Sequence, residues 1–181
     1  MTVPERREPD RLEQVAIDLF YGWGYAFYRD ENRLRADDLL VRHKAGGLLG
    51  DARASVEAAE SVYRRASLPP PSRAKPRPDP AAIEGARTIE RLSRDIGALE
   101  GQIRALPLPE PDRMSGWLRD EAAILSMLRD HDLRLVSRAQ YLRELLVGRD
   151  GAWIVGNAPL VGDTLAGLAA TLRMRGDVLA G

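Results

Sequence analysis

Four polar residues in the second half of the chain have side chains of the types that bind metals or transfer protons. The triplet Asp130-His131-Asp132 places an imidazole between two carboxylates, and Glu121 precedes it on the same expected helix. At helical spacing Glu121 lies on the apolar stripe, and His131 and Asp132 flank that stripe. The group predicts either a polar layer that fixes helix register or a metal or acid–base site. We favour the polar layer, and we keep Glu121, Asp130, His131 and Asp132 as metal-ligand candidates for the alternative.

The polar layer needs hydrogen-bond partners. In an antiparallel hairpin that turns near residue 110, residue 132 lies roughly opposite residue 88. Thr88 and Ser93 flank the apolar seam there, so we expect them to satisfy the polar groups of the layer.

Motifs that would favour an enzyme or a metalloprotein are absent from the sequence. It contains no cysteine and two histidines, so thiolate metal sites and cysteine nucleophiles are excluded. There is no Glu-x-x-His pair, His-Glu-x-x-His motif, phosphate-binding glycine loop or Gly-x-Ser-x-Gly elbow. We therefore expect no cofactor and favour a non-catalytic protein over an enzyme.

Residues 20–29, FYGWGYAFYR, contain most of the aromatic side chains of the chain. If this stretch is helical, Trp23 shares a face with Leu19, and the tyrosines lie on nearly the opposite face. A helix that is apolar on two sides is central in its bundle or covered by a partner. Three alternatives exist for what covers the tyrosines. The first is this chain's own last helix, the second is another protein or a second copy of the chain, and the third is a small molecule. The predicted partner-binding residues are Tyr21, Trp23, Tyr25 and Tyr28.

The same helix carries three charged residues further along the Trp23 face, namely Asp30, Arg33 and Asp37. They belong either to a buried ion cluster or to a helix end that leaves the bundle. We favour the second interpretation, in which this face is solvated.

Prolines divide the chain into three long segments rich in alanine, leucine, arginine and glutamate, which favour helix. The pattern predicts an all-α helical bundle of two antiparallel helical hairpins, the second one coiled-coil-like, plus a C-terminal helix. The first hairpin is expected to contain a helix from residue 10 to 44, a break at Gly46 and Gly47, and a second helix from Asp51 to Ser67. The boundaries expected along this single domain are a disordered N-terminus at 1–9, the first hairpin at 10–67, a proline-rich connector at 68–80, the second hairpin at 81–147 and a C-terminal helical segment at 148–181.

The second hairpin has the clearest periodicity in the sequence. Apolar residues recur at intervals of three and four, which is typical of a coiled-coil seam: Ile89, Leu92, Ile96, Leu99, Ile103 and Leu106. Asp79 and Pro80 suit the N-cap and the first helical position of this helix. A second stripe is expected on the following helix, from about Met114 to Val147, at Trp117, Leu125, Leu128, Leu135, Ala139, Leu142 and Leu146.

Composition limits the partners that the chain can have. Basic and acidic residues number 27 each, and no segment concentrates positive charge as nucleic-acid binders do, so we expect no nucleic-acid partner. Polar residues interrupt the apolar segment 152–172, so we expect no transmembrane span and no peripheral membrane contact. The N-terminus lacks the apolar run of a secretory signal, which predicts a cytoplasmic protein. The sequence thus favours a protein–protein interaction or assembly module that binds a protein partner or self-associates through the aromatic face. The alternative is a helical-bundle enzyme or metal-binding protein that uses the acid–histidine residues.

Overall fold

The computed structural model describes residues 18–19, 22–23, 31–73, 77–106 and 121–180, and these residues form helices and short connections. The predicted all-α class is confirmed. The helices are α2 (Glu31–Ser67), α3 (Pro80–Arg104), α5 (Glu121–Leu146), α6 (Gly151–Gly156) and α7 (Ala158–Ala180). Residues 1–9, for which disorder was expected, lie outside the described part of the chain.

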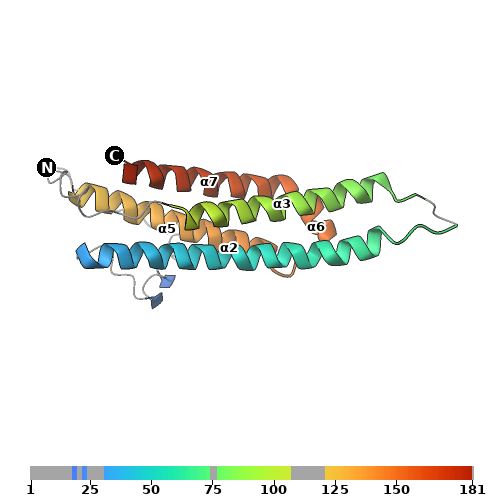
Figure 1. Cartoon of the computed structure of the whole chain (residues 1–181), viewed down its shortest axis with the longest axis horizontal. Helices are drawn as coiled ribbons and strands as arrows, with labels where there is room; N and C mark the ends of the chain where they lie inside the picture. The colour runs from blue at the N-terminus through green and yellow to red at the C-terminus, as the bar shows by residue number, and fades with distance from the viewer. Residues whose placement is uncertain (1–17, 20–21, 24–30, 74–76, 107–120, 181) are drawn as a thin grey trace.

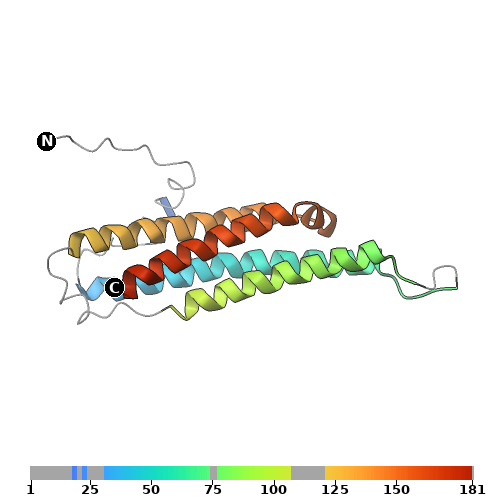
Figure 2. The ribbon, with the colours of Figure 1, turned by 90° about the horizontal axis from the view of Figure 1, so that it is seen from above.

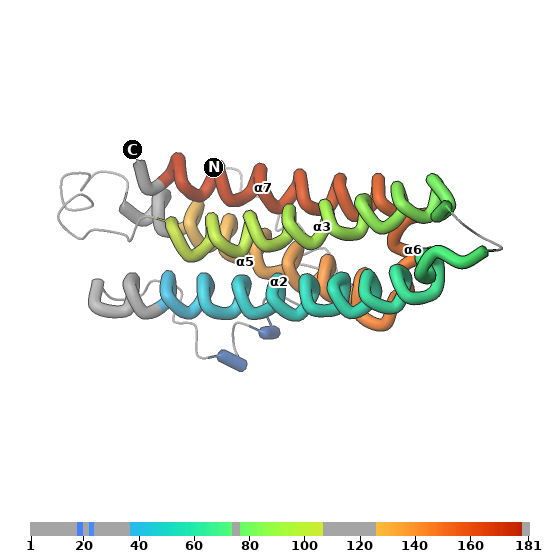
Figure 3. Tube along the Cα trace, turned by 45° about the vertical axis from the view of Figure 1, so that its right-hand side comes forward, coloured from blue at the N-terminus to red at the C-terminus, as the bar shows by residue number. Residues whose placement is uncertain are grey.

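The four long helices form an elongated bundle (Figure 1), in which each helix packs against two of the others, as at the corners of a square. α2 and α5 run in one direction, and α3 and α7 run in the other (Figure 1, Figure 2). α3 packs along α2 and α7, and α5 packs along the same two helices, so α3 and α5 occupy opposite corners of the square. The short helix α6 lies at the end of the bundle near the proline-rich connector (Figure 3).

The pairing of the helices differs from the predicted one. The sequence predicted a hairpin of the two helices within 81–147, but α3 and α5 are diagonal rather than adjacent. The two antiparallel neighbours in sequence are instead α2 with α3, across the connector, and α5 with α7, across α6. A short loop favours adjacent helices, but residues 105–120 are long enough to reach a diagonal corner as well.

The break predicted at Gly46 and Gly47 is also wrong, because α2 continues through both glycines for 37 residues. Two glycines in a helix interior cost about 2 kcal/mol relative to alanine. The apolar stripe that carries α2 through this region is fully buried, and its burial offsets that cost; it consists of Val41, Ala45, Leu49, Ala52 and Val56.

A single helix from residue 10 to 44 is excluded by the position of Trp23. In one straight helix Trp23 and Lys44 would be about 30 Å apart along the axis. The Lys44 Nζ atom lies 5.1 Å from the centroid of the Trp23 ring. Residues 22–23 are helical, but they pack beside α2 instead of extending it.

The periodic stripe predicted for α3 forms part of the core. Its residues from Ile89 to Ile103 are buried, as are the described members of the α5 stripe. Asp79 caps α3 by accepting a hydrogen bond from the Ala81 backbone N–H, and Pro80 occupies the first turn, as expected. None of the described helices combines the length and apolarity needed to cross a membrane.

Candidate functional site

A buried arginine joins three helices of the bundle near the start of α2 and the end of α7. Arg175 on α7 is fully buried. Its Nη2 atom donates to Asp38 Oδ1 on α2 at 2.7 Å, and its Nε atom donates to Asp132 Oδ1 on α5 at 2.6 Å. Both aspartates are also fully buried, so these charges pair with one another inside the protein rather than with water.

A second arginine extends this network to the end of α3. Arg42 is one helical turn after Asp38, and its Nε atom lies 2.7 Å from Asp38 Oδ2. The Arg42 Nη1 atom donates to the backbone carbonyl of Leu106, which follows α3. The network of Asp38, Arg42, Asp132 and Arg175, here called the ion network, therefore contacts all four corners of the bundle.

Burial of four charges is costly unless each is paired with good geometry. Here the guanidinium of Arg175 bridges two carboxylates that are on different helices, and each contact has the short distance of a charge-assisted hydrogen bond. Sliding α7 by one turn would remove both contacts and leave two buried carboxylates without Arg175. The arrangement thus fixes the axial position of α7 relative to α2 and α5.

The acid–histidine candidates do not come together as a metal site. Asp132 is in the ion network, whereas Asp130 is exposed on another face of α5. The Glu121 side chain lies outside the described residues, although its backbone starts α5. No group of three histidine, aspartate or glutamate side chains in the described ranges is arranged to bind a metal ion.

The partners predicted for this layer are also different in the structure. Ser93 Oγ donates to Glu57 at 3.2 Å, and Thr88 Oγ1 accepts from Arg91 at 3.3 Å. Neither contact involves α5, because α3 and α5 are diagonal. Asp132 does belong to a buried polar layer, but its partner is Arg175 instead of a residue of α3.

His131 lies next to the ion network and is partly buried. Burial lowers the pKa of His131 below its ordinary value of 6.5, and the positive charge of Arg134 lowers it further. Asp132 and Asp130 oppose this shift, and Arg175 adds to it weakly. Its Nδ1 atom is buried and has no hydrogen-bond partner among the described residues. The imidazole is consequently favoured in its neutral form.

The aromatic stretch is described only at Trp23 among the predicted partner-binding residues. Trp23 is partly buried, packs against the core, and its ring faces the Lys44 ammonium in a cation–π contact. Tyr21, Tyr25 and Tyr28 lie outside the described residues, so their predicted role in binding stays a prediction.

Sequence reasoning missed three members of the ion network and misjudged their surroundings. The face that carries Asp37 was expected to be solvated, but Asp37 is 3% exposed and Asp38 is fully buried. A signal for Arg175 was present in the sequence: it continues the 4-3-4-3 spacing of the buried apolar stripe on α7, which consists of Val161, Leu165, Leu168 and Leu172. An arginine in such a stripe requires buried carboxylates on neighbouring helices.

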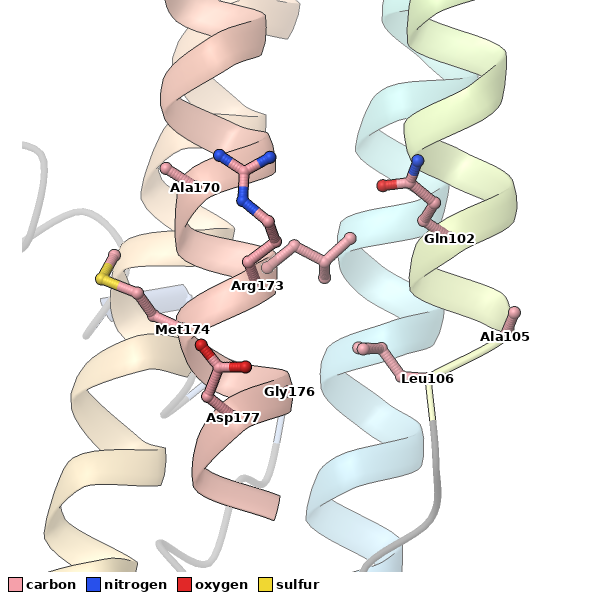
Figure 4. Close-up of a pocket in the computed structure, with 9 residues that line it drawn as sticks. Gln102, Ala105, Leu106, Ala170, Arg173, Met174, Gly176 and Asp177 are labelled. Atoms are coloured by element: carbon pink, nitrogen blue, oxygen red, sulfur yellow. The ribbon is translucent and has the colours of Figure 1, made fainter. Parts of the chain in front are cut away.

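A groove runs between the C-terminal ends of α3 and α7 and has a volume of about 650 Å³ (Figure 4). Leu106 and the buried Leu172 contribute apolar surface, and Met174 is 42% exposed at its edge. Arg173 and Asp177 on α7 and Gln102 on α3 provide its polar groups. Figure 4 shows the Arg173 and Gln102 side chains on the sides of their helices that border this gap.

No family model, curated protein or solved structure matches this chain. Its own surfaces and buried groups are thus the basis for inferring a function.

Proposed function

We propose that this protein is a non-catalytic protein–protein interaction or assembly module and that the α3–α7 groove is its docking surface. The observation that carries the proposal is the composition of this groove, an open apolar strip with a few polar groups beside it.

The side chains of the groove suit a helical segment of a protein. Leu106, Leu172 and Met174 offer apolar contact area, and the small residues Ala105 and Ala170 allow close approach of a partner. The partial exposure of Met174 shows that this apolar area is open to water and is available for burial.

The polar groups of the groove are better suited to orienting a partner than to catalysis. Gln102 offers an amide, Arg173 a fixed positive charge and Asp177 a carboxylate. There is no pair of a nucleophile and a base among them, which acyl or proton transfer would need. Hydrogen bonds from such groups set the position and direction of a bound helix.

The acid–histidine alternative has less support. Asp132 makes a 2.6 Å contact with Arg175 in the core, so this carboxylate is already neutralised. The aromatic face remains part of the proposal as a second contact region, with Trp23 at its described edge and the three tyrosines as predicted members.

The test is affinity capture of the tagged chain from its native cells, with bound proteins identified by mass spectrometry. Met174→Glu places a charge at the edge of the apolar groove, so we expect it to lose a stoichiometric partner. Val62→Glu is the matched control, because Val62 is 55% exposed on α2 away from the groove. Equal capture by both variants would contradict the proposal, provided that circular dichroism shows both to be folded.

A further inference from the structure

We propose that the partner of this module is a second copy of the same chain, which docks in an antiparallel orientation along the outer face of α7. This inference rests on the proposed function and names the occupant of the same surface.

The outer face of α7 is defined by the residues that the helix buries. The core stripe from Val161 to Arg175 lies on one side of α7. At 100° per residue the opposite side carries five residues at intervals of three and four, here called the outer stripe: Asp163, Ala166, Ala170, Arg173 and Asp177. In Figure 1, α7 lies at the outer edge of the bundle.

The spacing of the outer stripe is that of a two-helix seam. Intervals of three and four residues keep a stripe facing a single partner helix. Ala166 and Ala170 occupy the middle of the stripe, so two copies of α7 can approach closely there.

The charges of the outer stripe favour the antiparallel orientation and a register that uses the whole stripe. When two antiparallel copies of α7 cross at the level of Leu168, Asp163 of each copy aligns with Arg173 of the other, and Ala166 aligns with Ala170. A parallel arrangement would instead align each charged residue with its own copy. An antiparallel crossing at Ala170 would align Asp163 with Asp177, so both of these arrangements bring like charges together.

The charges of Asp163 and Arg173 face outward on α7 and are not used in contacts among the described residues. Neither makes an ion pair or a side-chain hydrogen bond with any described residue, and both are exposed. Several other exposed arginines are paired with a carboxylate of the same chain, for example Arg53 with Glu57 at 2.8 Å and Arg143 with Asp51 at 3.0 Å. The opposite charges of Asp163 and Arg173 are thus available to a partner that carries the same pattern reversed.

The seam continues into the groove of the proposed function. Ala170, Arg173 and Asp177 belong to both the outer stripe and the groove, and Met174 lies beside them. A second α7 on the outer stripe would cover the exposed Met174 side chain at each end of the contact, which adds apolar burial to the two charge pairs.

Charge reversal tests this register directly. Three kinds of sample are prepared: each single variant, Asp163→Arg or Arg173→Asp; an equal mixture of the two; and the double variant that carries both changes. Analytical ultracentrifugation measures the mass of each sample, and of the natural chain, as a function of concentration. We expect a dimer for the natural chain, at least about tenfold weaker dimerisation for each single variant, and recovery both in the 1:1 mixture and in the double variant.

Asp95→Arg is the matched control, because Asp95 is exposed on α3 and the substitution makes the same charge change away from α7. It should dimerise as the natural chain does. Far-UV circular dichroism verifies that each variant is folded. Any one of three results would overturn the inference. The natural chain stays monomeric, the single variants dimerise as the natural chain does, or the 1:1 mixture does not recover dimerisation.

The outcome also separates this inference from the proposed function. A monomeric chain whose cellular partner is lost in Met174→Glu but kept in Val62→Glu would overturn self-association and leave the interaction module intact. A monomeric chain whose captured proteins are the same for both variants would overturn both proposals.

Discussion

Replacing Arg175 by methionine is the most direct perturbation of the bundle interior. Methionine keeps a long flexible side chain at a fully buried position but removes the charge that contacts Asp38 and Asp132. Asp38 retains Arg42 at 2.7 Å in the variant, whereas Asp132 loses its 2.6 Å contact with Arg175. The expected loss of stability therefore comes mainly from the lost contact between Arg175 and the buried Asp132 carboxylate on α5.

The magnitude follows from the burial of that carboxylate. Removal of one partner from a buried ion pair costs about 3–5 kcal/mol, because the remaining charge stays desolvated. A domain of this size has a free energy of unfolding of about 5–15 kcal/mol, so the loss is a large part of the total. For a chain of this length it corresponds to a decrease in Tm of about 6–20 °C.

The assay is urea unfolding followed by circular dichroism, with Arg175→Met compared with the double variant Arg175→Met/Asp132→Asn. The double variant also removes the negative charge of the buried Asp132 side chain, so it should recover part of the lost free energy of unfolding. Arg94→Met is the control, because Arg94 is exposed on α3 and lies 3.8 Å from Glu90; it should change stability by no more than about 0.5 kcal/mol. A loss below about 1 kcal/mol for Arg175→Met, or a double variant no more stable than the single one, would refute the reasoning.

Two further predictions concern His131 and the glycines. Because burial lowers the pKa of His131 below 6.5, the unfolded chain binds a proton at His131 more readily than the folded chain does. The free energy of unfolding should therefore fall as the pH decreases below about 6.5. His131→Gln should reduce this pH dependence in denaturation curves measured at several pH values. Gly151→Ala should destabilise the protein by about 1–3 kcal/mol, because the added Cβ would lie 2.6 Å from the Tyr63 Cβ. At Gly101 an added Cβ has no neighbour within 4 Å outside its own helix backbone among the described residues, so Gly101→Ala should stabilise the protein by about 0.5–1 kcal/mol. Thermal melts of the two glycine variants check the second prediction, and equal shifts would contradict it.

Local features of the fold were predictable from sequence. The stripe from Ile89 to Ile103 was found because its spacing reflects helix geometry alone, and Asp79-Pro80 identified the start of α3 because capping depends on adjacent residues. The connector was located in the same way, since prolines cannot continue a helix and the described residues 68–73 and 77–79 are not helical.

Features that depend on distant residues were not predictable in the same way. The continuity of α2 through Gly46 and Gly47 is decided by burial of Ala45 and Leu49 against other helices, which overrides the local preference of glycine. The partner of Asp132 depends on which helices are adjacent, and that choice was wrong because loop length alone does not distinguish a neighbouring corner from a diagonal one.

The arrangement of the hairpins also determines the order in which contacts can form. α2 with α3, and α5 with α7, are each joined by a short stretch of chain, so the entropy lost in bringing either pair together is small. Within the ion network, the contact between Asp38 on α2 and Arg175 on α7 joins the two pairs and closes a loop of 137 residues. Such a contact is favoured only after both hairpins exist, so its contribution falls late on the folding pathway. We therefore expect the Asp38–Arg175 contact to slow the separation of the two hairpins more than it speeds their assembly.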